Sequence, residues 1–266
     1  MNCIVCIKQV PDTAKVKLDP KTHRLQRAGV ENIMNPFDEH ALEAALALRD
    51  AHGGTVTVLT MGPPQAEDVL RESIARGADR AVLVTDRTFG GADTLATSYT
   101  LAGAIRHLGG ADVILCGKQA IDGDTAQVGP QIAEMLDLPQ VTSVNRLACE
   151  NGHLTVTREH EDGYETLTVA LPALLTVTKN LNTPRYPSLM GKMKARKAPI
   201  ETLTAAELNL DAERIGIKGS PTRVRRVYTP EVRTQGIIWQ DLTPETAARQ
   251  LQDILGLGGR KDGAQA

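Results

Sequence analysis

The sequence predicts an α/β fold: a Rossmann-like, doubly wound, mostly parallel sheet with a small antiparallel extension and a C-terminal arm. Two observations predict it. Short runs rich in β-branched residues alternate with amphipathic helical stretches over roughly the first half of the chain. Ala, Val, Leu and Ile supply the apolar residues, while aromatic residues make up only 3% of the chain. This composition is typical of helices packed on a parallel sheet.

Strands and helices are expected in regular alternation from the N-terminus. The run Asn2–Ile7 (NCIVCI) is compact and apolar and ends in polar residues, as a buried parallel strand does. Asp38–Arg49 places Ala and Leu on one helical face, with Asp38 as the expected N-cap and Gly53–Gly54 as the expected helix end. Further strands are expected at 55–61, 81–85 and 112–116, and further helices from the turn at 62–64 to about residue 76, at 94–108 and at 124–136.

The pattern changes at Val141, where tight turns separate shorter runs. Strands expected at 143–148, 154–158, 165–170 and 174–178 are interpreted as a meander that completes the same domain. We therefore divide the chain into an α/β domain, residues 1–183, and a loop with a C-terminal arm, residues 184–266. This second part is basic and Pro-rich, and its one clear helix is Glu245–Leu255. It would bury too little apolar surface alone, so we expect it to pack on another protein.

Composition and charge disfavour several classes of protein. The formal net charge of −2 gives no reason to expect nucleic acid or an anionic membrane as a partner. No apolar run is long enough to span a bilayer, so membrane insertion is not expected. The N-terminus lacks the basic region of a signal peptide, and the four cysteines favour free thiols in a reducing compartment. We therefore expect a cytoplasmic protein.

The richest segment is Gly117–Pro130 (GKQAIDGDTAQVGP), which follows a predicted strand and opens a predicted helix. Its glycines let the backbone approach a ligand, and a helix start near Asp124–Thr125 offers N–H groups and a positive dipole end for phosphate. Asp122 and Asp124 fit better as an N-cap or as acceptors for ribose hydroxyls or an adenine amine. On pattern alone, an ordinary strand-to-helix turn stays open as an alternative. The segment is not a Walker A loop.

A second segment, Asp86–Thr97 (DRTFGGADTLAT), also lies between a predicted strand and a predicted helix. Its glycine pair is flexible, its two threonines in the helix lie one turn apart where they can bind a phosphate or polyol, and Asp93 is the natural N-cap. Unaided, this pattern fits a plain capped helix equally well. Asn35–Asp38 (NPFD) and Met61–Pro63 are two further turns of this kind. One long ligand crossing the carboxyl edge of the sheet would explain all four segments.

Other signals predict no metal and no catalytic side chain. Cys3 and Cys6 have CxxC spacing, but residues three apart on a strand point to opposite faces, so buried free thiols are expected. The six histidines lack metal-ligand spacing, and no Ser or Cys nucleophile motif is present. Basic residues from Arg185 to Lys197 surround Leu189–Met190. This cluster fits either a solvated face or a partner-docking loop.

These segments resemble one known family. KQAID at 118–122 and NPFD at 35–38 are similar to the nucleotide loops of electron-transferring flavoprotein beta subunits. A second group of residues resembles the signature sequence of that family: Val156–Arg158, Glu161–Gly163, Glu165, Leu167, Pro172 and Leu174–Thr176.

The resemblance extends over nearly the whole chain. Asn182–Glu201 is similar to the family's recognition loop, with Leu189 at the position of the hydrophobic anchor that docks into client dehydrogenases. The resemblance implies an adenine-nucleotide-hydrolase-like domain that binds a nucleotide, here residues 1–183. It also implies a recognition loop and arm, residues 184–266, packing on an alpha subunit in a heterodimer.

Within that family the chain resembles electron-bifurcating members, which hold FAD where ordinary members hold AMP and which oxidise NADH there. Ala126 stands where ordinary members have Asn, and Asp86–Thr97 looks like the FAD loop of bifurcating members. The resemblance then implies hydride transfer from NADH to FAD on this chain. One electron passes to ferredoxin or flavodoxin, and the other to the alpha-subunit FAD and an acyl-CoA dehydrogenase-type enzyme. NADH oxidation is expected only in the complex, and the flavin carries the chemistry.

The residues expected to line the nucleotide come from the strand ends and loops above, and Phe37 is also expected near the nicotinamide. Leu189 and Met190 are the expected partner-docking residues. The cofactor-binding set is Cys6, Asn35, Phe37, Asp38, Met61, Gly90, Gly91, Ala92, Asp93, Thr94, Thr97, Gln119, Asp122, Asp124, Thr125, Gln127, Val128 and Gly129.

Two other interpretations stay open. An ordinary beta subunit that holds structural AMP and relays electrons from dehydrogenases predicts one FAD per heterodimer in place of two. A nucleotide-binding regulatory or stress protein on a related α/β fold would need no flavin partner and would self-associate, but it leaves the long basic arm unexplained. A nucleic-acid binder is disfavoured by the charge balance.

Overall fold

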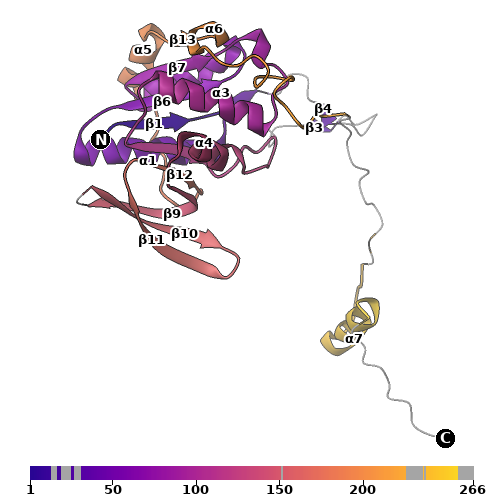
Figure 1. Ribbon diagram of the computed structural model, residues 1–266. Helices are drawn as coiled ribbons and strands as arrows, with labels where there is room; N and C mark the ends of the chain where they lie inside the picture. Colours follow the sequence, from indigo (N-terminus) through magenta and orange to yellow (C-terminus); the bar gives the residue numbers. More distant parts are fainter. Residues whose placement is uncertain are drawn as a thin grey trace, which may run out of the picture. The chain divides into compact units, whose positions relative to one another are not determined.

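The computed structural model describes residues 1–12, 17–18, 25–26, 31–150, 152–225, 236 and 238–256. The chain divides into two compact units, Met1–Arg226 and Val227–Ala266. The first unit holds a nine-stranded sheet with helices on both faces (Figure 1). The second holds helix α7 (Pro244–Ile254). The helix predicted at Glu245–Leu255 is confirmed within one residue at each end.

The strand order of the large sheet is β11-β10-β9-β12-β8-β1-β6-β7-β13. Every neighbouring pair from β9 through β13 in that order is parallel, and β10 is antiparallel to both β9 and β11. The predicted doubly wound, mostly parallel sheet with a small antiparallel extension is confirmed. The strands are β1 (Cys3–Cys6), β6 (Val56–Met61), β7 (Arg80–Val84), β8 (Val113–Gly117), β9 (Gln140–Glu150), β10 (His153–His160), β11 (Gly163–Ala170), β12 (Ala173–Val177) and β13 (Glu201–Leu203).

Two hydrophobic cores lie on opposite faces of this sheet. Cys3 and Val5 of β1 belong to the core under α1, α2 and α5, whereas Ile4 and Cys6 belong to the core under α3, α4 and α6. Both cysteines are buried and free, so the prediction of CxxC thiols facing opposite sides is confirmed. The helices are α1 (Pro36–His52), α2 (Glu67–Arg76), α3 (Thr94–His107), α4 (Val128–Leu136), α5 (Leu189–Lys197) and α6 (Ala205–Leu208), with short 3-10 turns η2 (Pro64–Ala66) and η3 (Arg87–Phe89).

Two predicted helix starts were wrong. α1 begins at Pro36 with Asn35 as its N-cap, so Asp38 lies inside the helix and does not cap it. Proline suits the first helical position because the amide there has no partner within the helix. α4 begins at Val128 in place of residue 124, because Asp124 and Ala126 have φ angles of 51° and 54°. Left-handed residues cannot continue a right-handed helix.

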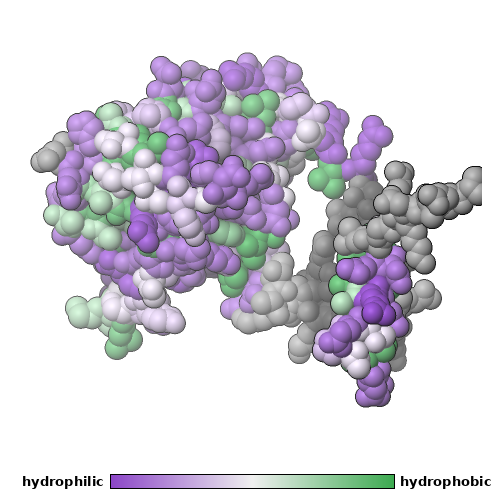
Figure 2. All heavy atoms as spheres, turned by 90° about the horizontal axis from the view of Figure 1, so that it is seen from below, coloured by the Kyte–Doolittle hydropathy of each residue, from purple (hydrophilic) through white to green (hydrophobic). Residues whose placement is uncertain are grey.

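The strands after residue 140 do not form the predicted sequential meander. β12 lies between β8 and β9 and is parallel to both, so the chain makes the β10–β11 hairpin and then returns to the middle of the sheet. All five residues of β12 are buried, as expected of a central parallel strand. The hairpin extends from the sheet in Figure 1. The face seen from below in Figure 2 is mostly hydrophilic with scattered hydrophobic side chains.

Two short pairs of strands occupy the connection from β1 to α1: β2 (Gln9–Pro11) with β5 (Asn32–Met34), and β3 (Lys17–Leu18) with β4 (Leu25–Gln26). Past residue 183, part of the segment assigned to the arm packs on the first unit. α5 packs against α2, and β13 extends the sheet beside β7. None of the described helices is long and apolar enough to cross a membrane.

Candidate functional site

The candidate site lies at the carboxyl edge of the parallel strands. From β1 the chain proceeds to α1 on one face of the sheet, and from β8 it proceeds to α4 on the other face. Because β1 and β8 are neighbours, the crevice beyond their ends is a topological switch point, where ligands bind in open α/β sheets. The four segments singled out in the sequence all lie next to strand ends at this edge.

Asn35 positions the loop that follows β8. Its side-chain amide donates to the Gln119 carbonyl at 2.9 Å, and its side-chain oxygen accepts from the Ile121 amide at 3.2 Å. Asn35 is 1% exposed. Both polar atoms of its side chain bond the backbone of the loop after β8, so Asn35 holds that loop in place.

Asp38 ties the ends of β1 and β8 together. Its carboxylate oxygens accept hydrogen bonds from the Lys8 amide at 2.7 Å and the Gly117 amide at 3.0 Å. Gly117 has no room for a side chain, because a Cβ would run into Asp38 and Phe37. Burial raises the pKa of Asp38 to about 7, although hydrogen bonds from Asn35 and the two amides favour the carboxylate.

Side chains also cross the switch point. The Lys8 ammonium lies 2.7 Å from both carboxylate oxygens of Asp122, and Gln119 Nε2 donates to Asp124 at 2.7 Å. On the α1 side, the Lys179 ammonium lies 4.8 Å from the centroid of the Phe37 ring. Phe37 as a whole residue is half-buried.

The loop before α4 is shaped to receive an anion. Ala126 is left-handed and Gln127 is right-handed (φ −106°, ψ −29°), a pairing that turns successive amides toward one point. Gln127 is the N-cap of α4, but its side chain makes no capping hydrogen bond. The first amides of α4 therefore lack a side-chain acceptor, and a phosphate would supply one.

The start of α3 is arranged differently. Asp93 Oδ1 accepts from the Leu95 and Ala96 amides at 3.0 and 3.1 Å, which confirms the predicted N-cap. Burial alone would raise the pKa of Asp93, but these bonds and those from Thr222 hold it below its usual value. Thr94 Oγ1 donates to Gln127 Oε1 at 3.0 Å and thus joins the starts of α3 and α4.

The remaining predicted residues are less connected. Cys6 ends β1 beside Cys116, and hydrogen bonding between the two thiols together with burial keeps the pKa of Cys116 well above its usual value. Within the described residues, no side-chain hydrogen bond joins Met61, Thr97 or Thr125 to a neighbouring loop. Gly90, Gly91 and Ala92 lie in the turn before α3, and Val128 and Gly129 open α4.

Sequence patterns missed four residues of this edge. Lys8 and Lys179 each come just after a strand of the sheet, and this position next to a strand end could have indicated that they belong to the site. Ser220 and Thr222 bind Asp93 from far along the chain, and nothing in their local pattern indicates it.

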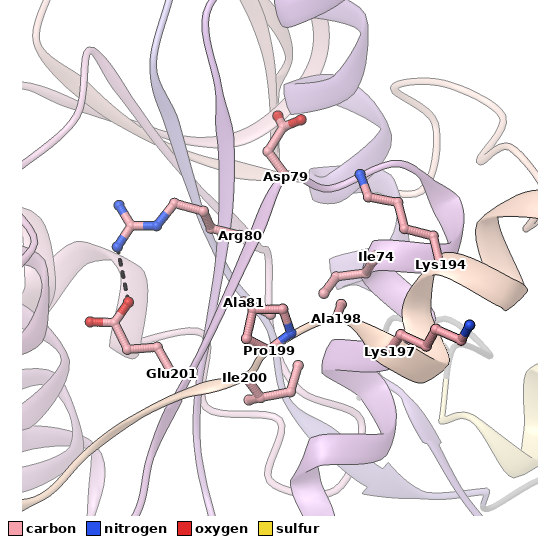
Figure 3. Close-up of a pocket in the computed structure, with 10 residues that line it drawn as sticks. All are labelled: Ile74, Asp79, Arg80, Ala81, Lys194, Lys197, Ala198, Pro199, Ile200 and Glu201. Carbon is pink, nitrogen blue, oxygen red and sulfur yellow. Dashed lines mark hydrogen bonds and ion pairs between the residues drawn. The ribbon is translucent and has the colours of Figure 1, made fainter.

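The residues present fit a nucleotide. Uncapped amides at α4 suit phosphate, and the exposed carboxylates of Asp122 and Asp124 suit ribose hydroxyls. A separate hollow of about 640 Å³ lies at the amino end of β7, between α2 and α5 (Figure 3). Lys194 and Lys197 of α5 line it, and Arg80 points toward Glu201. It lies at the opposite end of β7 from the nucleotide loops.

Helix α5 presents apolar side chains to solvent. Leu189 is 78% exposed and Met190 is 82% exposed. Ser188 caps the helix through the Gly191 amide at 2.9 Å, and Arg71 of α2 donates to the Ala195 carbonyl at 2.6 Å. The helix is therefore held on the first unit while its outer apolar side chains stay uncovered.

The fold and this edge define an α/β protein with a candidate nucleotide site at its topological switch point. Residues 22–208 match the model of the electron transfer flavoprotein domain. The chain is 53% identical to the electron transfer flavoprotein subunit beta of Megasphaera elsdenii over 90% of this chain and 91% of that protein. It is 52% identical to the caffeyl-CoA reductase-Etf complex subunit CarD of Acetobacterium woodii, covering 89% of this chain and 90% of that protein.

Protein FixA of Azorhizobium caulinodans is 48% identical, over 93% of this chain and 90% of its own length. The chain belongs to the electron transfer flavoprotein family, as a beta-type subunit. A beta subunit implies an alpha partner and redox partners.

Proposed function

We propose that this chain binds FAD along the carboxyl edge of its sheet and that NADH is the hydride donor to that FAD. The observation that carries the proposal is the joined pair of helix starts. Thr94 of α3 bonds Gln127 of α4, so two neighbouring loops form one continuous surface. AMP needs only one of these loops, whereas the longer FAD can use both. When bound, the flavin supplies two-electron chemistry with NADH and one-electron chemistry with the next carriers.

Each loop then has a role that its geometry supports. The uncapped α4 amides and the Ala126–Gln127 turn bind phosphate, and Asp122 and Asp124 accept from ribose hydroxyls. Asn35 and Asp38 hold the start of the loop after β8 through hydrogen bonds to its backbone. The other predicted residues of the turn before α3 and of the β6 end line the remainder of the nucleotide. Phe37, which is only partly buried, lies beside the nicotinamide.

The partners follow from the surfaces. Leu189 and Met190, exposed on α5, dock an acyl-CoA dehydrogenase-type enzyme. The name of the CarD relative supports this kind of partner, because that protein is a subunit of a caffeyl-CoA reductase-Etf complex. The arm packs on the alpha subunit through apolar side chains such as Leu251 and Ile254, which are exposed on α7. One electron passes to the alpha-subunit FAD and one to ferredoxin or flavodoxin, in the cytoplasm.

An ordinary carrier that holds AMP is the second candidate. The hydrogen bonding of Asp93 favours this AMP-holding carrier. Both carboxylate oxygens of Asp93 already accept hydrogen bonds, and the capped start of α3 offers fewer free amide donors to a ligand than the start of α4. The discriminating experiment is to purify the heterodimer with its alpha subunit, release the bound nucleotides and count FAD and AMP. Our proposal predicts two FAD and no AMP, and the carrier predicts one of each.

A further inference from the structure

A segment from the far end of the first unit packs on the turn that precedes α3. This strap, Ile215–Thr222, inserts Ile215 into the core under α3 and α4, where it is 5% exposed. Gly91 has a φ angle of 71°, and a Cβ there would lie 2.5 Å from Ile217. A Cβ on Gly216 would run into the Thr88 carbonyl. The two segments therefore fit together without space for a further side chain on either glycine.

Asp93 is the polar centre of this contact. Its amide donates to Ser220 Oγ at 2.8 Å, and the buried Ser220 hydroxyl donates to the Gly216 carbonyl at 2.7 Å. Asp93 Oδ2 accepts from the Thr222 amide at 3.0 Å and from Thr222 Oγ1 at 2.9 Å. The other carboxylate oxygen caps α3. One side chain thus holds the helix start with one oxygen and the strap with the other.

The strap lies close to the end of the first unit. Thr222 lies four residues before Arg226, where this unit ends. Any change in the strap bears directly on the carboxylate that caps α3 through the Leu95 amide, and Thr94, the first residue of α3, in turn bonds Gln127 at the start of α4. This chain of contacts connects the strap to the loops of the candidate nucleotide site.

We propose that Ser220 and Thr222 are positioning residues of the nucleotide site: by holding Asp93 they couple nucleotide binding to the packing of the strap on the turn before α3. The inference rests on the proposed function, because it assumes that a nucleotide occupies the loops at α3 and α4. Coupling of this kind is reciprocal, so a bound nucleotide must tighten the strap as much as the strap tightens the nucleotide.

The test uses the full chain in complex with its alpha subunit, stripped of nucleotide and titrated with FAD and with AMP. Hydrogen exchange of the Thr222 amide reports the strap in the unaltered protein. We expect FAD to slow this exchange at least severalfold. Ser220→Ala combined with Thr222→Val should weaken FAD binding about tenfold, because two hydrogen bonds to Asp93 are lost. Thr222→Ser keeps the hydroxyl and should bind as the unaltered chain does.

Thr155→Val is the matched control, since Thr155 is an exposed residue of β10 on the hairpin. It should change neither FAD binding nor the exchange of Thr222. If FAD binds but exchange of Thr222 is unaffected and the double variant binds equally well, the coupling is wrong and the proposed function stands. If the unaltered complex binds AMP and not FAD, the proposed cofactor is wrong. The coupling is then tested with AMP, by the exchange of the Thr222 amide and by the AMP affinity of the double variant. If neither nucleotide binds, both fail.

Discussion

Lys8 and Asp122 form an ion pair across the switch point, with the ammonium 2.7 Å from both carboxylate oxygens. The pair joins the loop after β1 to the loop after β8. Both side chains keep part of their surface exposed, 47% and 31%, so solvent screens the attraction. We expect a direct contribution to stability below about 1 kcal/mol. Its larger effect is on where the nucleotide loop lies.

Lys8→Met should therefore weaken nucleotide binding severalfold while leaving the unfolding midpoint of the complex almost unchanged. Arg80→Met is the control, because it breaks the Arg80–Glu201 pair of 2.9 Å, which is similarly exposed but lies at the other end of β7. The control should bind nucleotide normally. Equal affinities in both variants would show that the Lys8 pair does not position the loop.

Asp38 should give the complex a distinctive pH dependence. Burial raises its pKa from 3.8 to about 7 in the folded chain, so the folded state binds more protons than the unfolded state between those values. The free energy of unfolding should then fall as pH rises from about 4 to about 7 and level off above. The contribution is on the order of a few kcal/mol.

Asp38→Asn removes this titration. Lys8 and the Cys116 thiol are the other titratable groups coupled to Asp38, and both stay in the variant. Urea unfolding of the unaltered protein and of Asp38→Asn from pH 4 to pH 8 measures the free energy of unfolding of each. The difference between the two curves gives the pH dependence that Asp38 contributes. Parallel curves over that range would contradict a raised pKa at Asp38.

Ala126 is a left-handed alanine on an exposed loop. Because such a conformation costs an L-residue about 1 kcal/mol, Ala126→Gly should not destabilise the complex and should leave FAD binding intact. If the chain holds FAD as proposed, Ala126→Asn should shift nucleotide preference from FAD toward AMP, because the sequence resemblance implies Asn at this position in AMP-holding members. Titration of stripped complex with each nucleotide measures the preference. An unchanged preference in Ala126→Asn would show that residue 126 does not set the choice between FAD and AMP.

Leu189→Ala on α5 should slow electron transfer to the dehydrogenase partner without changing nucleotide content. Leu189 is 78% exposed, so its truncation costs no core packing, and an anchor at a docking surface is worth about 1–2 kcal/mol of affinity. Tyr164→Ala removes a similarly exposed side chain from β11 and serves as the control. Equal transfer rates for the two variants would place docking elsewhere.

Thiol labelling should single out Cys149. Cys3, Cys6 and Cys116 are buried, so these thiols are poorly accessible to a reagent. Burial also raises the pKa of Cys3 to about 12, and the pKa of Cys116 lies well above its usual value, so these two thiols stay protonated. Cys149 is only partly buried. Mass spectrometry after alkylation of the native complex should find Cys149 modified first on this chain. Early modification of Cys6 would mean that the end of β1 opens readily.

Much of the fold follows from local pattern. The four short apolar runs expected as strands before residue 120 all form parallel strands of the sheet, because a strand buried on both faces needs continuous apolar residues. Asp93 was placed correctly, since its capping bonds are local. Asp38 resembled an N-cap as strongly, but Pro36 moved the helix start and left Asp38 to bind the Gly117 amide across the sheet.

The contacts that sequence patterns missed are distant ones. Ser220 and Thr222 lie 127 and 129 residues from Asp93, so no local spacing connects them. The place of β12 between β8 and β9 depends on pairing between distant strands. The left-handed backbone at Asp124 and Ala126 also carries no sequence signal, because neither residue is glycine.

The central claim is that this chain holds a flavin reduced by NADH. The most direct measurement is anaerobic addition of NADH to the purified heterodimer while flavin absorbance and released nucleotide are followed. Our account predicts bleaching of flavin with consumption of NADH, in a complex that contains two FAD and no AMP. An unchanged flavin spectrum, in a complex that releases one FAD and one AMP, would contradict it and identify an ordinary electron carrier.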